Sequence, residues 1–160
     1  MIKEINKNEI SECVSVIRKS FQTVADEFCF TIENAPRFTA FATTEERLFY
    51  QLEYEHRLMV AYYDDGKILG YYSIQFLENN ECELNNLCVL PECRHKKIGE
   101  ALLEDAVARA KNNKCTKMKI SIVEENMVLR RWYEKYGFVH TNTIKYDFFP
   151  FTCGYMEKVL

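Results

Sequence analysis

One stretch of the chain, residues 83–112, limits the folds that this sequence can adopt. It reads ELNNLCVLPECRHKKIGEALLEDAVARAKN and begins with a short β-rich segment that Pro91 must end, because proline has no amide hydrogen for a sheet ladder. A basic loop follows, and apolar residues spaced by three and four predict a helix from Gly99 to about Asn112. A strand, a loop and a helix in this order are the parts of a layered α/β domain.

The N-terminal part of the chain predicts two helices. Asn8 is placed to cap the first, whose apolar residues fall on one face, and the helix should continue one or two turns beyond Phe21 before a loop. Thr43 and Glu46 form a capping-box pattern, so a second helix is expected to run to about Tyr54.

β-rich and alternating segments predict the strands. They lie at residues 2–5, 58–63, 67–76, 84–90 and 116–123, again from residue 138 onward, and at 155–160. Asp65-Gly66 is a favoured two-residue turn, so the segments on either side should form a hairpin. Another helix should begin after Asn126 and end at Gly137, which is placed as a left-handed cap.

This order of elements indicates the fold class. A hairpin in the middle and strand–helix crossovers later predict an α/β fold of mixed α+β character: a single mixed, mostly antiparallel sheet of about six or seven strands with helices on both faces. The 160 residues suit one domain, residues 1–160.

Composition narrows the class of protein further. The net charge of −3 argues against nonspecific nucleic-acid binding, and no apolar run has membrane length. No basic, apolar-centred leader opens the chain, so we expect a cytoplasmic protein.

Seven cysteines are present without a CxxC pair, and several of them, including Cys13, Cys29 and Cys88, lie in apolar runs. Free buried thiols in a reducing compartment explain them. We expect no metal site, because neither the cysteines nor the histidines show ligand spacing.

The basic loop and the helix after it could bind an anion. The first turn of a helix leaves backbone N–H groups unpaired and carries partial positive charge, and Gly99 lets a ligand approach the backbone. Arg94, Lys96 and Lys97 should add charge at the rim. From these residues alone, a phosphate site and an ordinary basic turn both remain open.

Two blocks resemble the GNAT superfamily of N-acetyltransferases. VLPECRHKKIGEALLEDAV (89–107) is similar to that family's acetyl-CoA loop, and NMVLRRWYEKYGF (126–138) is similar to its second motif. The resemblance implies the acyl-CoA N-acyltransferase fold, with acetyl-CoA as co-substrate and an amine of a small molecule or peptide as acceptor. It also implies a strand that splays from its neighbour at a bulge, and Asn85-Asn86 suits such a bulge.

The same resemblance assigns the cofactor contacts. The pantetheine arm should pair with the strand at Leu87, Cys88 and Val89, and the diphosphate should bind the loop and helix start. Those loop positions are Arg94, His95, Lys96, Lys97, Ile98, Gly99 and Glu100, and Asn126 and Tyr133 complete the set. Lys97 departs from the family, which usually has glycine there; we expect a negative φ at this position.

Catalysis should need a base and an acid, because an alkylammonium with a pKa near 10.4 is inert at neutral pH. Glu83 matches the position of a basic glutamate in one branch of the family and shares strand parity with Asn85 and Leu87; a solvated glutamate is the alternative. Glu78 and Glu81 are further candidates. Tyr133 matches the tyrosine aimed at the sulfur of CoA, although it also belongs to an apolar helix stripe.

The acceptor site is expected between residues 21–57 and the last two strands. These regions are rich in Phe and Tyr, with Asp26, Glu27 and Glu33 nearby, which suits an amine on an apolar or aromatic body. A dimer that pairs through residues 155–160 is possible on this sequence.

Two other functions stay open. One is a CoA-binding module without turnover. The other is an interaction domain that uses exposed aromatic residues, namely Phe38, Phe41, Phe148, Phe149 and Phe151.

Overall fold

The computed structural model describes all residues, 1–160, and contains seven strands in one sheet. The strands are β1 (Ile2–Glu4), β2 (Leu58–Asp64), β3 (Lys67–Phe76), β4 (Glu81–Val89), β5 (Lys117–Val123), β6 (Val139–Ile144) and β7 (Cys153–Val159). The helices are α1 (Ile10–Phe28), α2 (Thr39–Ala42), α3 (Glu45–Glu53), α4 (Ile98–Asn112) and α5 (Met127–Lys135), with short 3-10 turns η1 (Lys7–Glu9) and η2 (Pro91–Cys93).

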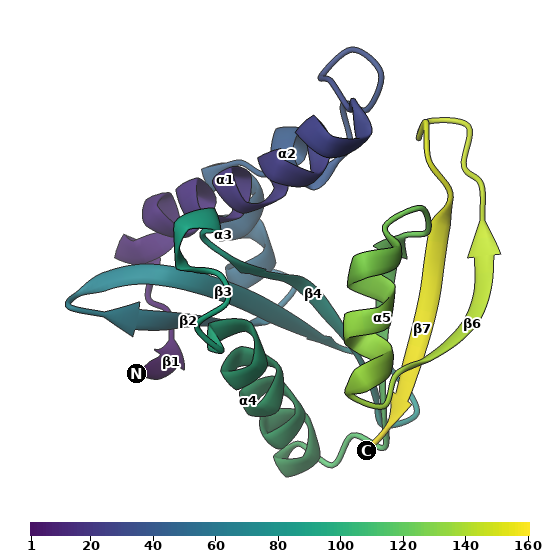
Figure 1. Ribbon diagram of the computed structural model, residues 1–160. Coiled ribbons are helices and arrows are strands. Elements are labelled where there is room, and N and C mark those ends of the chain that lie inside the picture. The colour runs from purple at the N-terminus through teal and green to yellow at the C-terminus, as the bar shows by residue number, and fades with distance from the viewer.

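The predicted fold class is confirmed by the strand order. The sheet runs β1-β2-β3-β4-β5-β7-β6, and only the β4–β5 pair is parallel. Apolar residues of α4 and α5 pack on one face, and those of α1 and α3 pack on the other. A single sheet covered on both faces is therefore the frame for any site (Figure 1).

A third apolar cluster lies outside these two layers. Aromatic rings from α1 and the segment after it, among them Phe30 and Phe38, pack against Phe151 before β7 and against Val123 at the end of β5. This cluster joins the N-terminal helical region to the β6–β7 end of the sheet, which Figure 1 shows as a separate arm.

Two predicted helix caps are wrong by one or two residues. Asn6, not Asn8, caps η1 and accepts a hydrogen bond from the Asn8 amide, because a 3-10 turn precedes α1. Thr44, not Thr43, caps α3 and accepts from the amide of Arg47 at 3.1 Å. Thr43 instead donates its hydroxyl hydrogen to the carbonyl of Thr39.

Residues 155–159 offer no free strand edge for the dimer pairing considered from the sequence, and a homodimer stays a prediction. They lie in β7, which pairs with β5 on one edge and with β6 on the other. Its backbone groups are therefore used within the chain, and the free edges of the sheet belong to β1 and β6.

The sheet parts between β4 and β5, as the family resemblance implied. The two strands pair only from Glu81 to Glu83 on β4 and from Lys117 to Lys119 on β5. Between Asn85 and Cys88 the register between β3 and β4 shifts, and Asn86 has a φ of 56°. An asparagine tolerates this left-handed conformation, so the predicted bulge at Asn85-Asn86 is confirmed.

The bulge changes which side chains share a face. Glu83 pairs with Gln75 and Cys88 pairs with Tyr71, and these positions face the α1 side of the sheet. Leu87 instead packs against the core beneath α4. The expected parity of Glu83 with Leu87 is therefore wrong, because one extra residue in a strand reverses the alternation that follows it.

All seven cysteines are free, but not all of them are buried. Cys29 is exposed, because it follows α1 as a left-handed cap with φ of 59° rather than continuing the buried stripe. Cys13 and Cys88 are buried as predicted. None of the helices is both long and apolar enough to span a bilayer.

Candidate active site

The loop before α4 forms a concave row of unpaired backbone amides. No protein oxygen accepts from the N–H groups of residues 95–100, and the first helical bond of α4 runs from Ala101 to the carbonyl of Lys97. His95 and Lys97 both have left-handed φ values, 62° and 63°. Alternation of left-handed and other residues turns successive N–H groups toward one point, which is the geometry that binds anions.

The expectation of a negative φ at Lys97 is wrong. Its φ of 63° and ψ of 13° place it in the left-handed region that the family's glycine would adopt freely. A lysine there costs roughly 1 kcal/mol or more. The position is the N-cap of α4, so the loop reaches its curvature at the expense of backbone strain.

We expected Arg94 to add charge at the rim of this loop, but its side chain points to α1 instead. Its guanidinium donates to the carbonyl of Ser20 at 2.9 Å and to the hydroxyl of Thr23 at 3.0 Å, both on α1. It also donates to the carbonyl of Val89 at 3.3 Å. Arg94 therefore ties the end of β4 to α1, and the exposed side chains left at the loop are His95, Lys96 and Lys97.

Two other loop positions can contribute only backbone to a ligand. Ile98 is buried, so its side chain belongs to the core beneath α4. At Gly99, an added Cβ would lie 3.7 Å from both Trp132 on α5 and Val89 on β4. The start of α4 thus faces the end of β4 and the side of α5.

The edge of β4 that faces β5 is free along the expected pantetheine segment. Cys88 and Val89 pair with Tyr71 and Gly70 on β3, whereas the pairing with β5 has already ended at Glu83. An unpaired strand edge presents N–H and C=O groups to an extended ligand. This edge leads from the amide row into the gap between the two halves of the sheet.

Tyr133 lies buried on the inner side of α5, and no protein group accepts a hydrogen bond from its hydroxyl. Burial raises the pKa of Tyr133 well above its ordinary value, and the nearby Cys88 raises it further. Tyr133 belongs to the core cluster beneath α4, which Leu87 and Val89 of β4 also pack against. The phenol stays protonated at physiological pH.

The thiol of Cys88 is inert as a nucleophile. Burial raises its pKa to about 12, although Ser20 and Arg94 act in the opposite direction. The thiolate is the reactive form, so a thiol that stays protonated does not compete for the acetyl group.

Glu83 stands where β4 and β5 part. It pairs with Lys119 in the last parallel position, and its charge is one of the influences that raise the pKa values of Tyr155 on β7 and Lys119 on β5. Glu81, a second candidate base, has its pKa lowered by a hydrogen bond from Lys119 at 2.7 Å and is committed to that ion pair.

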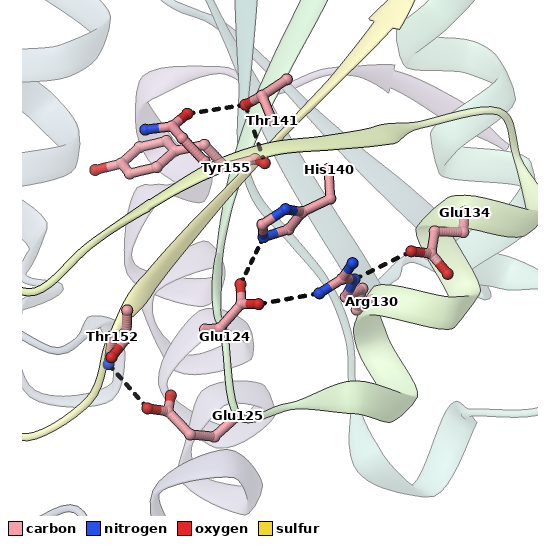
Figure 2. A network of polar contacts seen from close by, with 9 residues as sticks. Glu124, Glu125, Arg130, Glu134, His140, Thr141, Thr152 and Tyr155 are labelled. Atoms are coloured by element: carbon pink, nitrogen blue, oxygen red, sulfur yellow. Dashed lines mark hydrogen bonds and ion pairs between the residues drawn. The ribbon is translucent and has the colours of Figure 1, made fainter.

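Polar contacts hold helix α5; its cap at Asn126 was predicted from the sequence, and its link to β6 through Glu124 was not. Asn126 caps it by accepting from the Leu129 amide at 3.2 Å. Figure 2 shows Glu124 between His140 on β6, at 2.8 Å, and Arg130 on α5, at 3.0 Å. A Cβ at Gly154 would lie 2.1 Å from the Glu124 carboxylate, so only glycine leaves room for this network.

A pocket of about 170 Å³ opens between α1, the end of β5 and the start of α5, and we call it the acceptor groove because the sequence predicts the acceptor site in this region. Nine of its 13 lining residues are apolar, including Phe21, Phe38, Phe149 and Phe151. Ser121 and Asn126 line its inner wall from β5 and the start of α5.

Two expectations about this region need correction. The acids Asp26, Glu27 and Glu33 do not line the groove, and its charged lining residue is Arg37, which the sequence reading missed. Phe38 and Phe151 are buried rather than exposed, because the aromatic rings pack on one another. Of the five aromatic residues expected at the surface, Phe148 is the exposed one.

Comparisons with known proteins agree with this geometry. A protein-family model described as "Acetyltransferase (GNAT) family" matches residues 26–138. Because this match spans more than half of the chain, the chain belongs to the GNAT family of acetyltransferases.

Two relatives match about three fifths of the chain. A Bacillus subtilis protein named as a candidate ribosomal protein bS18-alanine N-acetyltransferase is 25% identical over 59% of this chain and 62% of its own length. A spermidine N(1)-acetyltransferase of Thermoplasma acidophilum is 30% identical over 57% of this chain and 56% of its own. The chain thus spans less than two thirds of the length of each.

One solved structure shares the fold over its whole length. The PaiA N-acetyltransferase of Thermoplasma acidophilum, crystallised with coenzyme A, superposes with a TM-score of 0.86 at 21% identity. The superposition covers 100% of this chain and 98% of that one.

Proposed function

We propose that this protein transfers the acetyl group of acetyl-CoA to a primary amine of a small molecule or peptide, by direct attack within a ternary complex. The observation that carries the proposal is the free edge of β4, which runs from the amide row at residues 95–100 into the gap beside β5. Such an edge suits the pantetheine arm, and the amide row suits the diphosphate.

The backbone would hold the cofactor. The N–H groups from His95 to Glu100 would donate to the diphosphate oxygens, with Lys96 and Lys97 adding positive charge nearby. Leu87, Cys88 and Val89 would pair with the amide groups of the pantetheine arm as a neighbouring strand does. Asn126 keeps its side-chain nitrogen free for the same ligand while its oxygen caps α5.

The chemistry would be an aminolysis of the thioester. The neutral amine nitrogen attacks the carbonyl carbon, the C–N bond forms, and the C–S bond then breaks. Glu83 would accept the proton from the amine, directly or through water, and the Tyr133 hydroxyl would give a proton to the departing thiolate. Burial raises the pKa of Tyr133 and keeps its hydroxyl protonated at neutral pH, so the hydroxyl can donate a hydrogen bond to the sulfur as charge develops there.

The relatives support an amine acceptor but differ in its identity. One is named for spermidine and another for an alanine of ribosomal protein bS18. Both are primary amines, which is the common chemistry that we propose for this chain.

The test combines a cofactor titration with a turnover assay. Isothermal titration with acetyl-CoA should show binding, and Gly99→Asp should weaken it by at least tenfold. An aspartate in the first turn stabilises a helix but repels a diphosphate, so the fold should survive. Gly99→Ala, whose Cβ meets only ordinary contacts, is the matched control.

Release of free thiol over a diverse amine library then tests turnover. Absence of binding at millimolar acetyl-CoA would contradict the proposal. Tight binding without turnover on any amine would instead identify a CoA-binding module without catalysis.

A further inference from the structure

The acceptor groove contains one charged side chain, and it is a cation. Its four polar lining residues are Arg37, Thr39, Ser121 and Asn126, and Arg37 alone carries charge. A groove built to receive a cationic amine by charge would instead present carboxylates. The cation at Arg37 therefore indicates that the acceptor carries a second, negatively charged group in addition to its amine.

Arg37 is exposed, and its chain neighbours and one aromatic ring fix its position at the groove. It stands between Pro36, which restricts the backbone, and Phe38, which is only 5% exposed. Phe38 contacts Phe151 edge-on with ring centroids 5.9 Å apart. The guanidinium lies 4.2 Å over the ring of Phe148, on the connection between β6 and β7.

The aromatic platform under the guanidinium is itself fixed. Phe148 stacks on Tyr146 with centroids 5.1 Å apart, and the Tyr146 hydroxyl lies 2.9 Å from that of Tyr155 on β7. Lys145 donates to the carbonyls of Tyr146 and Phe149 and so closes the same connection. The arginine thus rests on an ordered surface.

The hydrogen-bonding edge of Arg37 is free. No carboxylate lies within ion-pair distance of it, and none of its side-chain N–H groups donates to a protein oxygen. Stacking uses the face of the guanidinium and leaves its planar fork of donors available. That fork matches a carboxylate, which it binds through two parallel hydrogen bonds.

We propose that Arg37 binds a carboxylate of the acceptor, so that the substrate is an amine whose apolar or aromatic body also bears an acid. The inference rests on the proposed acetyl transfer and names its substrate class. The four phenylalanines of the groove would contact the body of the molecule, and the amine would reach the thioester between β4 and β5. A polycation such as spermidine would meet repulsion from Arg37.

The experiment uses a pair of acceptors that differ only in charge. 4-(Aminomethyl)benzoate and 4-(aminomethyl)benzamide present similar amines on the same ring, and L-phenylalanine and spermidine extend the series. Binding is measured by titration calorimetry with protein saturated with CoA, and turnover is measured by thiol release. The wild type should bind the benzoate about tenfold to hundredfold more tightly than the benzamide.

Three variants make the result specific. Arg37→Gln should reduce the preference to about threefold or less while leaving binding of the benzamide unchanged. Arg37→Glu should reverse the preference for the benzoate over the benzamide and should favour spermidine. Arg47→Gln, which removes an exposed arginine of α3 that forms no ion pair, should behave as the wild type.

Equal affinity of the wild type for the two ring compounds would overturn the inference, as would a preference that survives in Arg37→Gln. Because binding is read independently of turnover, these results are separable from a failure of the proposed reaction. Loss of turnover on every amine, with the benzoate preference intact, would contradict acetyl transfer and leave the carboxylate site standing.

Discussion

The cofactor side and the acceptor side of this site are built from different parts of the polypeptide. On the proposed cofactor side, backbone groups form the surface: the N–H groups of residues 95–100, in the loop before α4 and its first turn, and the free edge of β4. On the acceptor side, side chains form the surface, namely aromatic rings and one arginine. The difference teaches that a fold can prescribe how a cofactor binds through its backbone while leaving the second substrate to a few side chains.

The largest effect should come from the residue between the two sides. Tyr133→Phe removes the proposed proton donor, so kcat should fall by about 10²- to 10³-fold. The affinity for acetyl-CoA and the melting temperature should stay unchanged, because the hydroxyl has no protein partner. Steady-state kinetics and a cofactor titration measure both, and full turnover in this variant would remove Tyr133 from the mechanism.

A smaller effect, on the free energy of unfolding, should distinguish the buried aromatic residues beside the acceptor groove from the exposed ones. Phe151→Ala deletes a buried ring that packs on Phe30 and Phe149, which should cost about 3 kcal/mol in the free energy of unfolding. Phe148→Ala, at the exposed end of the same group, should cost less than about 1 kcal/mol. Urea denaturation compares them, and equal losses would show that the aromatic cluster is not graded by burial.

The cofactor side should respond to backbone strain at Lys97. Lys97→Gly relieves the left-handed conformation but loosens the unfolded chain, so the net change in stability should be within about 1 kcal/mol. Lys97→Ala keeps the strain and removes the charge. If the amide row dominates binding, the glycine variant should bind acetyl-CoA at least as tightly as the alanine variant does. An equal loss of affinity in both variants, relative to the wild type, would mean that the charge matters more than the backbone.

The smallest effect should come from Cys88. Its thiol has a pKa of about 12, so Cys88→Ala should keep kcat within about twofold. Alkylation at neutral pH should modify the exposed Cys29 and spare Cys88, which mass spectrometry of the digested protein can show. A large loss of turnover in Cys88→Ala would point to a covalent acetyl intermediate.

The sequence was informative where a residue type has one structural use. Pro91, the Asp65-Gly66 turn and the Asn85-Asn86 pair each mark a backbone requirement, so the strands, the hairpin and the bulge were predicted close to their observed places. The caps at Asn6 and Thr44 were displaced, because neighbouring asparagine and threonine residues can serve equally and only the hydrogen bond decides.

The acceptor side was harder to predict because its geometry depends on distant contacts. Nothing local to Arg37 or Phe148 indicates that they meet, since they are joined through the packing of Phe38 on Phe151. The destination of Arg94 was missed for the same reason, as Ser20 and Thr23 lie on a helix far away in sequence. A basic residue near a phosphate loop is easily assigned to the phosphate.

The parting of β4 from β5 has a consequence for the stability of the protein. Only three residue pairs join the two half-sheets by backbone hydrogen bonds, so an extended ligand in the gap would complete the ladder between them. Occupancy would then couple to folding by mass action, adding about 2.7 kcal/mol at a ligand concentration a hundredfold above Kd. Amide hydrogen exchange in β4 and β5 should slow on binding, and the cofactor would act as a removable strand of the fold.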